Sequence, residues 1–297
     1  MRVLITGGSG FIGRALSSAL AARGDEVIIL TRSPQALPVA GNRRVVAALE
    51  QIEGPLDAVV NLAGAPIVDQ RWSASRKQVL RASRIEVTNT LVAWMQQQAP
   101  PPAVLVSASA TGYYGSHADE VLDESAEPTP GFAHELCRDW ERAALEAESL
   151  GVRVCLIRLG VVLGAGGGAL AKMLPLFRLG LGGPVGSGKQ WLSWIHLDDV
   201  VAATLYLLDS PPLHGPFNLT APEPVTNELF SRTLGRRLHR PAFLRVPATV
   251  MKLLLGEASE LLLEGQRVVP ENLLTAGYRF QQPRLEDALR SILEQKS

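Results

Sequence analysis

Four glycines near the start of the chain have the spacing of a turn that binds a dinucleotide. The segment TGGSGFIG at 6–13 follows a short apolar run and leads into a stretch with helical periodicity over 14–23. Gly8 would permit the tight turn, Gly10 would let the backbone approach a pyrophosphate, and Gly13 would let the helix pack against the strand. The free amides at the helix start would face the phosphates. This order predicts a dinucleotide site; the alternative is a purely structural glycine turn.

The end of the second predicted strand distinguishes between the two nicotinamide cofactors. In an NAD site an acidic residue about 20 residues past the glycines accepts hydrogen bonds from the adenosine ribose. Here that place holds Thr31, Arg32 and Ser33. A carboxylate would repel a 2′-phosphate, whereas a guanidinium and a hydroxyl can bind one through charge-assisted hydrogen bonds. The sequence therefore predicts NADP(H), unless Arg32 is only a solvated surface charge.

The elements that must position these residues alternate between strands and helices. Short runs rich in apolar and β-branched residues predict strands at 2–6, 26–32, 43–49, 57–63, 103–109 and 153–160. Helical stretches, notably 74–98 and 134–150, lie between several of them. Such alternation is typical of a parallel sheet with helices on both faces. We expect an α/β fold, a Rossmann-type doubly wound parallel sheet with a smaller C-terminal lobe.

Composition narrows the partners of the protein. Of its 297 residues 46% are hydrophobic, and 29 basic side chains balance 29 acidic ones. Because the net charge is zero, no overall electrostatic field favours binding of nucleic acid or anionic lipid. A small-molecule substrate is therefore expected. Cys137 and Cys155 have neither a metal-ligand spacing nor a disulfide framework, and no metal is expected. Without a signal segment or an apolar run of membrane-spanning length, the sequence predicts a cytoplasmic protein, and it leaves open whether this is a monomer or a homodimer.

Several phrases of the sequence resemble the extended short-chain dehydrogenases/reductases, the family of sugar-nucleotide epimerases and dehydratases. TGGSGFIG at 6–13, NLAG at 61–64 and IHLDDV at 195–200 carry this resemblance. SASATGYYG, RLGVVLGAGGGAL and LLLEGQRVVPENLL are similar to an atypical, epimerase-like branch. The resemblance implies an NADP(H)-binding Rossmann domain over 1–221. It also implies a lobe of unassigned function over 222–297 that closes over a substrate cleft.

The same resemblance implies a set of cofactor contacts. Most of them lie in the glycine turn or at the ends of predicted strands, where small residues would let the backbone approach the adenosine and ribose. The residues expected to contact NADP(H) are Gly7, Gly10, Phe11, Ile12, Thr31, Arg32, Leu62, Ala63, Arg84, Ser107 and Val162.

The usual catalytic pair of this family is missing. Family members carry a Tyr and, four residues later, a Lys at the start of the helix after the fifth strand. The Tyr exchanges a proton with the substrate oxygen, and the Lys lowers the pKa of that Tyr. Here Ala133 and Cys137 align with the pair, and no other Tyr is followed by a Lys at that spacing. Sugar epimerisation by the standard mechanism is therefore not expected.

Side chains near the expected nicotinamide are the candidates that remain. Ser109 ends the fifth strand, where the family places a substrate-bonding hydroxyl, and Tyr113 and Tyr114 follow. We take these three as candidate catalytic residues, although each Tyr could equally serve packing. His134 could donate a proton near neutral pH or lie on a helix surface. Arg158 could bind a substrate phosphate or carboxylate, or be a solvated charge at a strand end.

Two further glycine-rich segments have alternative interpretations. The segment GPVGSGKQ at 183–190 nearly matches a P-loop, but Gln190 replaces the magnesium-binding hydroxyl and the following residues look extended. NTP hydrolysis is not expected, and the resemblance instead places Lys189, Gln190 and Trp191 at the substrate cleft. The glycines at 165–168 could cradle an anion or form only a flexible loop.

Two classes of function are compatible with these features. The first is an NADP(H)-dependent oxidoreductase or epimerase-like enzyme acting on an unidentified small carbonyl or sugar-nucleotide-like substrate. A Ser/Thr/Tyr cluster or a water would then supply the proton. The second is a non-catalytic NADP(H)-binding redox sensor or scaffold. The glycine motif supports both, whereas hydroxyls beside the nicotinamide in a substrate cleft would support only the first.

Overall fold

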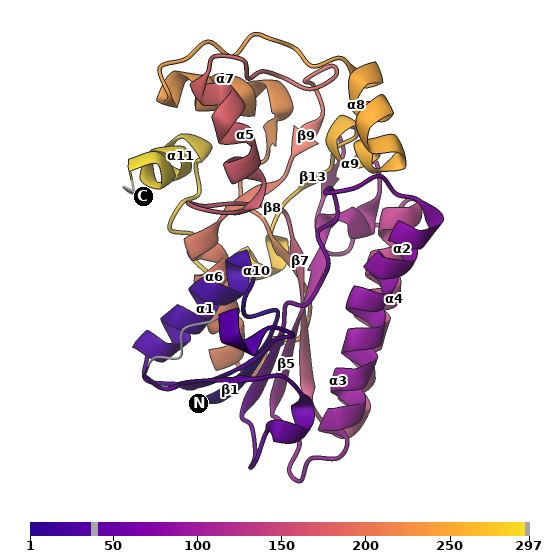
Figure 1. Cartoon of the computed structure of the whole chain (residues 1–297), viewed down its shortest axis with the longest axis vertical. Helices are drawn as coiled ribbons and strands as arrows, with labels where there is room; N and C mark the ends of the chain where they lie inside the picture. The colour runs from indigo at the N-terminus through magenta and orange to yellow at the C-terminus, as the bar shows by residue number, and fades with distance from the viewer. Residues whose placement is uncertain (37–40, 295–297) are drawn as a thin grey trace.

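A parallel sheet of seven strands forms the centre of the computed structural model, which describes residues 1–36 and 41–294 (Figure 1). The strand order is β3-β2-β1-β4-β5-β7-β11. The chain winds outward from β1 to β3 and then crosses to β4 on the other side of β1. Doubly wound sheets bind ligands at such a switch point, at the carboxyl ends of the strands. The strands are β1 (Arg2–Thr6), β2 (Glu26–Leu30), β3 (Arg43–Val46), β4 (Ala58–Asn61), β5 (Val104–Ala110), β7 (Arg153–Leu159) and β11 (Gly215–Leu219).

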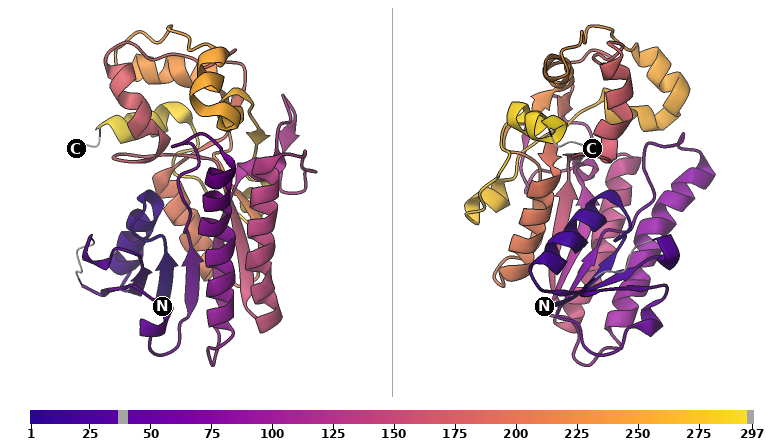
Figure 2. Two further views of the ribbon diagram at one scale, coloured as in Figure 1. Left: turned by 45° about the vertical axis from the view of Figure 1, so that its right-hand side comes forward. Right: turned by 60° about the vertical axis from the view of Figure 1, so that its left-hand side comes forward.

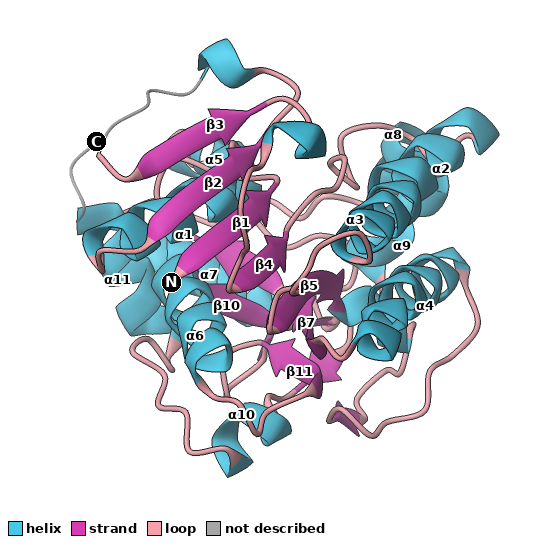
Figure 3. Cartoon of the chain, turned by 90° about the horizontal axis from the view of Figure 1, so that it is seen from below, coloured by secondary structure: helices cyan, strands magenta, loops and turns pink. Residues whose placement is uncertain are grey.

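Helices cover both faces of this sheet (Figure 3). α1 (Phe11–Ala22) and α6 (Leu197–Asp209) lie on one face, and α3 (Val87–Met95) and α4 (Phe132–Leu145) lie on the other. Because each face packs against helices, the central strands are buried on both sides. Two apolar cores result, one on each face.

The predicted fold class is confirmed, and all six predicted strands are present. The second, third and fourth strands end earlier than predicted, at Leu30, Val46 and Asn61. β11 is absent from the prediction because Gly215 and Pro216 weaken its strand pattern. It lies at the edge of the sheet, where a proline is tolerated.

The predicted helix at 74–98 is divided in the structure. α2 (Ala74–Arg81) and α3 (Val87–Met95) are separated by a π-helical turn at Ala82–Glu86. Such turns alter the direction of the side chains they carry and are frequent at functional sites. This turn carries Arg84, one of the expected cofactor contacts.

A smaller lobe lies beyond the ends of the strands, in the upper part of Figures 1 and 2. Its core joins Leu170 and Trp194 to Phe230 and Leu289. Residues before and after position 221 thus share one core, and the division into 1–221 and 222–297 stays a prediction. The remaining elements are β6 (Val121–Leu122), β8 (Val161–Leu163), β9 (Trp191–Leu192), β10 (Trp194–His196), β12 (Val225–Thr226), β13 (Arg267–Val268), α5 (Gly168–Arg178), α7 (Asn227–Arg237), α8 (Ala248–Leu255), α9 (Glu260–Leu263), α10 (Glu271–Thr275) and α11 (Leu285–Glu294).

Candidate functional site

The glycine turn closes tightly onto the end of β4. A Cβ atom on Gly7 would lie 2.6 Å from the Leu62 carbonyl oxygen, and one on Gly13 would lie 2.4 Å from the Gly7 carbonyl oxygen. The close packing predicted for Gly13 is confirmed. The tight turn, however, depends on Gly7, whose φ of +67° favours glycine. Gly8 instead makes room for the Ile29 side chain, which a Cβ there would meet at 2.5 Å.

Phe11 links the glycine turn to the segment after β8. A Cβ on Gly168 would lie 2.9 Å from the Val162 carbonyl oxygen and 3.0 Å from the Phe11 ring. A Cβ on Gly167 would lie 2.2 Å from the same ring. Gly167 and Gly168 therefore make room for an aromatic ring, and the structure brings Phe11 and Val162 close together. Ile12 packs against the core on the α1 face.

The end of β2 lies beside this turn. The Thr31 hydroxyl is 3.5 Å from the Ser9 hydroxyl and accepts a hydrogen bond from the Ser33 amide at 3.3 Å. The Arg32 side chain is exposed and makes no ion pair with any described residue. A phosphate bound here would meet a free guanidinium and hydroxyl groups, as the sequence predicts.

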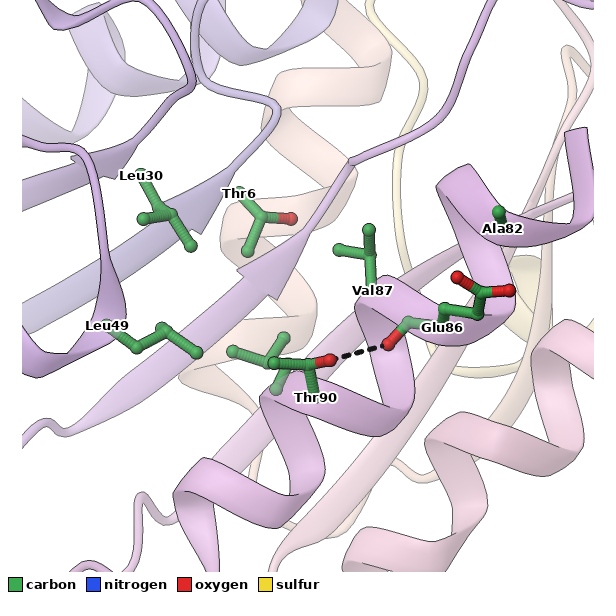
Figure 4. Close-up of a pocket in the computed structure, with 8 residues that line it drawn as sticks. Thr6, Leu30, Leu49, Ala82, Glu86, Val87 and Thr90 are labelled. Carbon is green, nitrogen blue, oxygen red and sulfur yellow. Dashed lines mark hydrogen bonds between the residues drawn. The ribbon is translucent and has the colours of Figure 1, made fainter. Parts of the chain in front are cut away.

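A cavity of about 270 Å³ lies at the carboxyl ends of β1 and β2, next to α3 (Figure 4). Its walls are mostly apolar, with a carboxylate and two hydroxyls at its edges. An apolar slot with a few polar groups suits a flat heteroaromatic ring. No sequence motif indicated it, because its walls come from four separate segments of the chain. The lining residues are Thr6, Leu30, Leu49, Ala82, Glu86, Val87, Thr90 and Leu91.

Arg84 lies at the loop that follows the expected contacts Leu62 and Ala63. A Cβ on Gly64 would lie 3.2 Å from its guanidinium carbon, and its Nη2 donates to the Ala65 carbonyl at 3.0 Å. Burial lowers the pKa of Arg84. Keeping the Arg84 guanidinium charged in this buried position costs free energy. This charged group lies beside the expected cofactor contacts Leu62 and Ala63.

Both serines of β5 are buried. Ser107 is fully buried, and its hydroxyl accepts a hydrogen bond from Asn61 Nδ2 at 3.3 Å. Ser109 is 2% exposed and donates to Glu141 Oε1 at 2.6 Å. Both hydroxyls are therefore engaged within the protein.

Arg158 lies at the centre of a buried polar network. It is 4% exposed, and its Nε and Nη2 donate to the two Glu141 carboxylate oxygens, each at 2.9 Å. Burial lowers the pKa of Arg158, but the Glu141 carboxylate and the Tyr114 hydroxyl together outweigh this effect, and the net pKa is raised. Arg158 Nη1 donates to the Tyr114 hydroxyl at 3.0 Å. Arg158 is thus neither a solvated charge nor free to bind a substrate phosphate, and both sequence interpretations are wrong.

The two tyrosines differ in what their hydroxyls contact. The Tyr114 hydroxyl donates to Asn218 Oδ1 at 2.7 Å, and burial raises its pKa to about 12. The Tyr113 ring is half-buried and stacks on Arg158, with 3.5 Å between the guanidinium carbon and the ring centroid. Its carbonyl oxygen accepts a hydrogen bond from His134 Nδ1 at 2.7 Å. Of the three candidate catalytic side chains, Tyr113 alone has a hydroxyl without a partner among the described residues.

Ala133 and Cys137 face the turn that carries these tyrosines. A Cβ on Gly112 would lie 3.4 Å from Ala133 Cβ and 3.8 Å from Cys137 Sγ. Burial, followed by the nearby Glu141 carboxylate, raises the pKa of the Cys137 thiol to about 12. Cys137 thus remains protonated and enclosed at neutral pH.

The segment at 183–190 does not open a helix. Gln190 Nε2 donates to the carbonyls of Val185 and Leu262, at 3.0 and 2.8 Å, and strand β9 follows directly. The predicted extended segment is confirmed. Lys189 is exposed, and the Trp191 indole donates to Asp119 at 2.8 Å.

Comparison with protein families gives two matches. The model described as "NAD dependent epimerase/dehydratase family" matches residues 3–219, and a domain of unknown function, DUF1731, matches residues 246–292. The chain is 43% identical to the Arabidopsis thaliana "Epimerase family protein SDR39U1 homolog, chloroplastic", covering 99% of this chain and 87% of the relative. It is 40% identical to the Mus musculus epimerase family protein SDR39U1, covering 99% and 100%. Because one relative is named chloroplastic, a cytoplasmic location stays a prediction. No helix in the described part of this chain is long and apolar enough to cross a membrane.

Solved structures show the same fold. The human epimerase family protein SDR39U1, crystallised with NADPH, superposes with a TM-score of 0.90 at 36% identity, with full coverage of both chains. A UDP-glucuronic acid 4-epimerase from Bacillus cereus superposes with a TM-score of 0.80 at 17% identity, covering 98% of each chain. The second similarity supports the fold alone.

Proposed function

Because the chain belongs to the NAD dependent epimerase/dehydratase family, we propose that it is an NADP(H)-binding, epimerase-like oxidoreductase. Its substrate would be a small carbonyl compound or a sugar-nucleotide-like molecule. The observation that carries the cofactor choice is the exposed Arg32 beside Thr31 and Ser9, and the NADPH held by the human relative supports it. Bound NADP(H) would supply or accept a hydride. The glycine turn fits its pyrophosphate, and the cavity in Figure 4 fits its adenine.

Within this proposal Tyr113 is the favoured proton donor. Its hydroxyl has no hydrogen-bond partner in the part of the chain that the structure describes, whereas those of Ser109 and Tyr114 are bonded inside the buried network. Arg158 fixes the Tyr113 ring from one side, and His134 contacts it edge-on with ring centroids 5.3 Å apart. These contacts restrict the ring to one orientation. Ser109 and Tyr114 then act by holding the network that supports it.

Cofactor binding without turnover is the second candidate function. It is favoured by the resemblance to the family, in which Ala133 and Cys137 stand at the positions of the missing catalytic pair. A redox sensor or scaffold would need the glycine turn, the cavity and Arg32, but not a free hydroxyl at Tyr113.

One experiment separates these two functions. Calorimetric titration first measures the affinities for NADPH and NADH. The NADPH-loaded protein is then mixed with a panel of carbonyl compounds and sugar nucleotides, and NADPH oxidation is followed by absorbance in a single turnover. Oxidation by a panel member supports the enzyme, whereas tight NADPH binding without oxidation across the panel supports the non-catalytic function. A protein that binds neither cofactor contradicts both.

A further inference from the structure

We propose that the outer end of the smaller lobe binds the surface of an anionic membrane, through exposed leucines flanked by unpaired cations. Two parts of the chain form this end: the last turn of α5 with the residues that follow it, and the segment 240–255, which includes α8. They lie side by side, because Arg240 Nε donates to the Arg178 carbonyl at 2.9 Å and a Cβ on Gly180 would lie 3.3 Å from Pro241 Cγ. The stretch between α7 and α8 runs across the top of Figure 1.

Large apolar side chains are exposed on both segments. Phe243 is 75% exposed, Leu253 73% and Leu179 72%. No residue of α8 is buried, and Val250, Leu253 and Leu254 lie three and four positions apart on it, so they share one face of the helix. A cluster of exposed apolar side chains commonly marks an interaction site. We call the following residues the outer patch: Leu176, Leu179, Leu181, Phe243, Leu244, Val250, Leu253 and Leu254.

The same segments carry cations and no carboxylate. Residues 229–256 contain six arginine or lysine residues and residues 168–190 contain three, and neither range contains an aspartate or a glutamate. Arg178, Arg240 and Lys252 are exposed, and none of them forms an ion pair with any described residue. The zero net charge of the whole chain conceals this local excess of positive charge. Charge complementarity therefore favours a negatively charged partner for the outer patch.

An anionic bilayer surface fits this combination better than other partners do. Leucine and phenylalanine side chains can enter the boundary between headgroups and acyl chains, while arginine and lysine contact anionic headgroups. In a symmetric pair of copies the patch would face itself and bring like cations together. Nucleic acid is bound through phosphate contacts and stacking on aromatic rings, and aliphatic leucines supply neither. The cores of protein–protein interfaces are rich in Tyr, Trp and Met, and the outer patch contains none of these.

The outer patch is separate from the cofactor turn. α5 starts at Gly168, beside the Phe11 ring of the glycine turn, and ends at Arg178. At about 1.5 Å per residue, this helix places its last turn roughly 16 Å from its start. Membrane binding at the outer patch requires neither the cofactor nor turnover, and it is therefore independent of the proposed function.

The test is sedimentation of the full-length protein with vesicles of phosphatidylcholine alone, and with vesicles of three parts phosphatidylcholine to one part phosphatidylserine. We expect binding to the anionic vesicles only, and we expect sodium chloride to weaken it. The double variant Arg178→Gln with Lys252→Gln should lower the partition coefficient at least about tenfold, because it removes two exposed cations. The double variant Leu179→Ser with Phe243→Ser should lower it by a similar factor, because it removes two exposed apolar side chains.

Two matched controls change exposed side chains outside the outer patch. Arg279→Gln removes an exposed cation, and Leu145→Ser removes an exposed leucine at the end of α4. Both should bind the anionic vesicles as the unaltered protein does. Thermal unfolding of each variant shows whether it is folded.

Each other result overturns the proposal. Absence of binding to the anionic vesicles would make an acidic protein surface the candidate partner. Equal binding to both kinds of vesicle would contradict an anionic partner. Folded patch variants that bind as tightly as the controls would place the membrane contact elsewhere. If the protein ignores the vesicles but self-associates in sedimentation velocity, and Leu179→Ser with Phe243→Ser abolishes this association, the outer patch joins two copies of the chain.

Discussion

At the scale of single residues, we expect Arg32 to decide the choice of cofactor. In Arg32→Asp a carboxylate would face the 2′-phosphate, so we expect NADPH affinity to fall by about tenfold or more and the preference to shift to NADH. Calorimetric titration with both cofactors measures this. Arg279→Asp, which changes another exposed arginine, should leave the preference intact. Equal affinities for NADPH and NADH in the unaltered protein would contradict the assignment.

Tyr113 should matter for turnover more than its neighbours. If a substrate is found, Tyr113→Phe should lower the single-turnover rate by about 10²–10⁴-fold, the effect of losing one positioned proton donor. NADPH affinity should change little. Cys137→Ala should retain the activity, because the buried thiol stays protonated. A Tyr113→Phe variant with the native rate would move the proton donor to another group or to a water.

Tyr114 should affect how the free energy of unfolding depends on pH in alkaline solution. Burial raises its pKa from an ordinary value of 10.0 to about 12, so the folded state holds the phenolic proton more tightly than the unfolded state. Its contribution to the free energy of unfolding is complete below pH 10 and is lost as the pH rises toward 12. In Tyr114→Phe the decline of stability over this range should be shallower. Urea unfolding curves measured across the range test this, and an unchanged slope would show that Tyr114 does not contribute.

At the scale of elements, the Arg158–Glu141 ion pair joins β7 to α4. Arg158→Met leaves a buried carboxylate without its partner, which typically costs about 3–5 kcal/mol. Arg158→Met combined with Glu141→Leu removes both charges and should recover part of that loss. Denaturant unfolding measures both variants. A single variant as stable as the unaltered protein would mean that water reaches the carboxylate.

At the scale of the whole molecule, the C-terminal lobe should not fold alone. Its core includes Leu163, Leu170, Phe177 and Trp194, all of which precede position 222. A fragment over 222–297 lacks these partners, and short segments rarely bury enough apolar surface to fold. Calorimetry should show no cooperative transition, and the amide spectrum should be poorly dispersed. A fragment that melts cooperatively would overturn this expectation.

Local patterns were sufficient for the fold class and for the position of the glycine turn. Each parallel strand is a short apolar run, because both of its faces are buried, and the turn must place its glycines at fixed offsets from β1. The sequence pattern over 74–98 predicted the local structure less completely. Helical periodicity predicts one helix there, and it does not register the single extra residue that a π-helical turn inserts near Arg84.

The amino-acid sequence by itself determined the sheet, the turn at 6–13 and the absence of an acidic residue beside Arg32, because these depend on residues close together in the chain. Only the tertiary structure decided which polar side chains are already engaged in hydrogen bonds and ion pairs within the protein. Ser109 and Arg158 lie near the ends of strands, and Tyr114 follows one, much as exposed site residues would, but Glu141 and Asn218 engage them. Tyr114 and Asn218 are 104 positions apart. Burial of a side chain depends on such distant partners, and no local pattern records them.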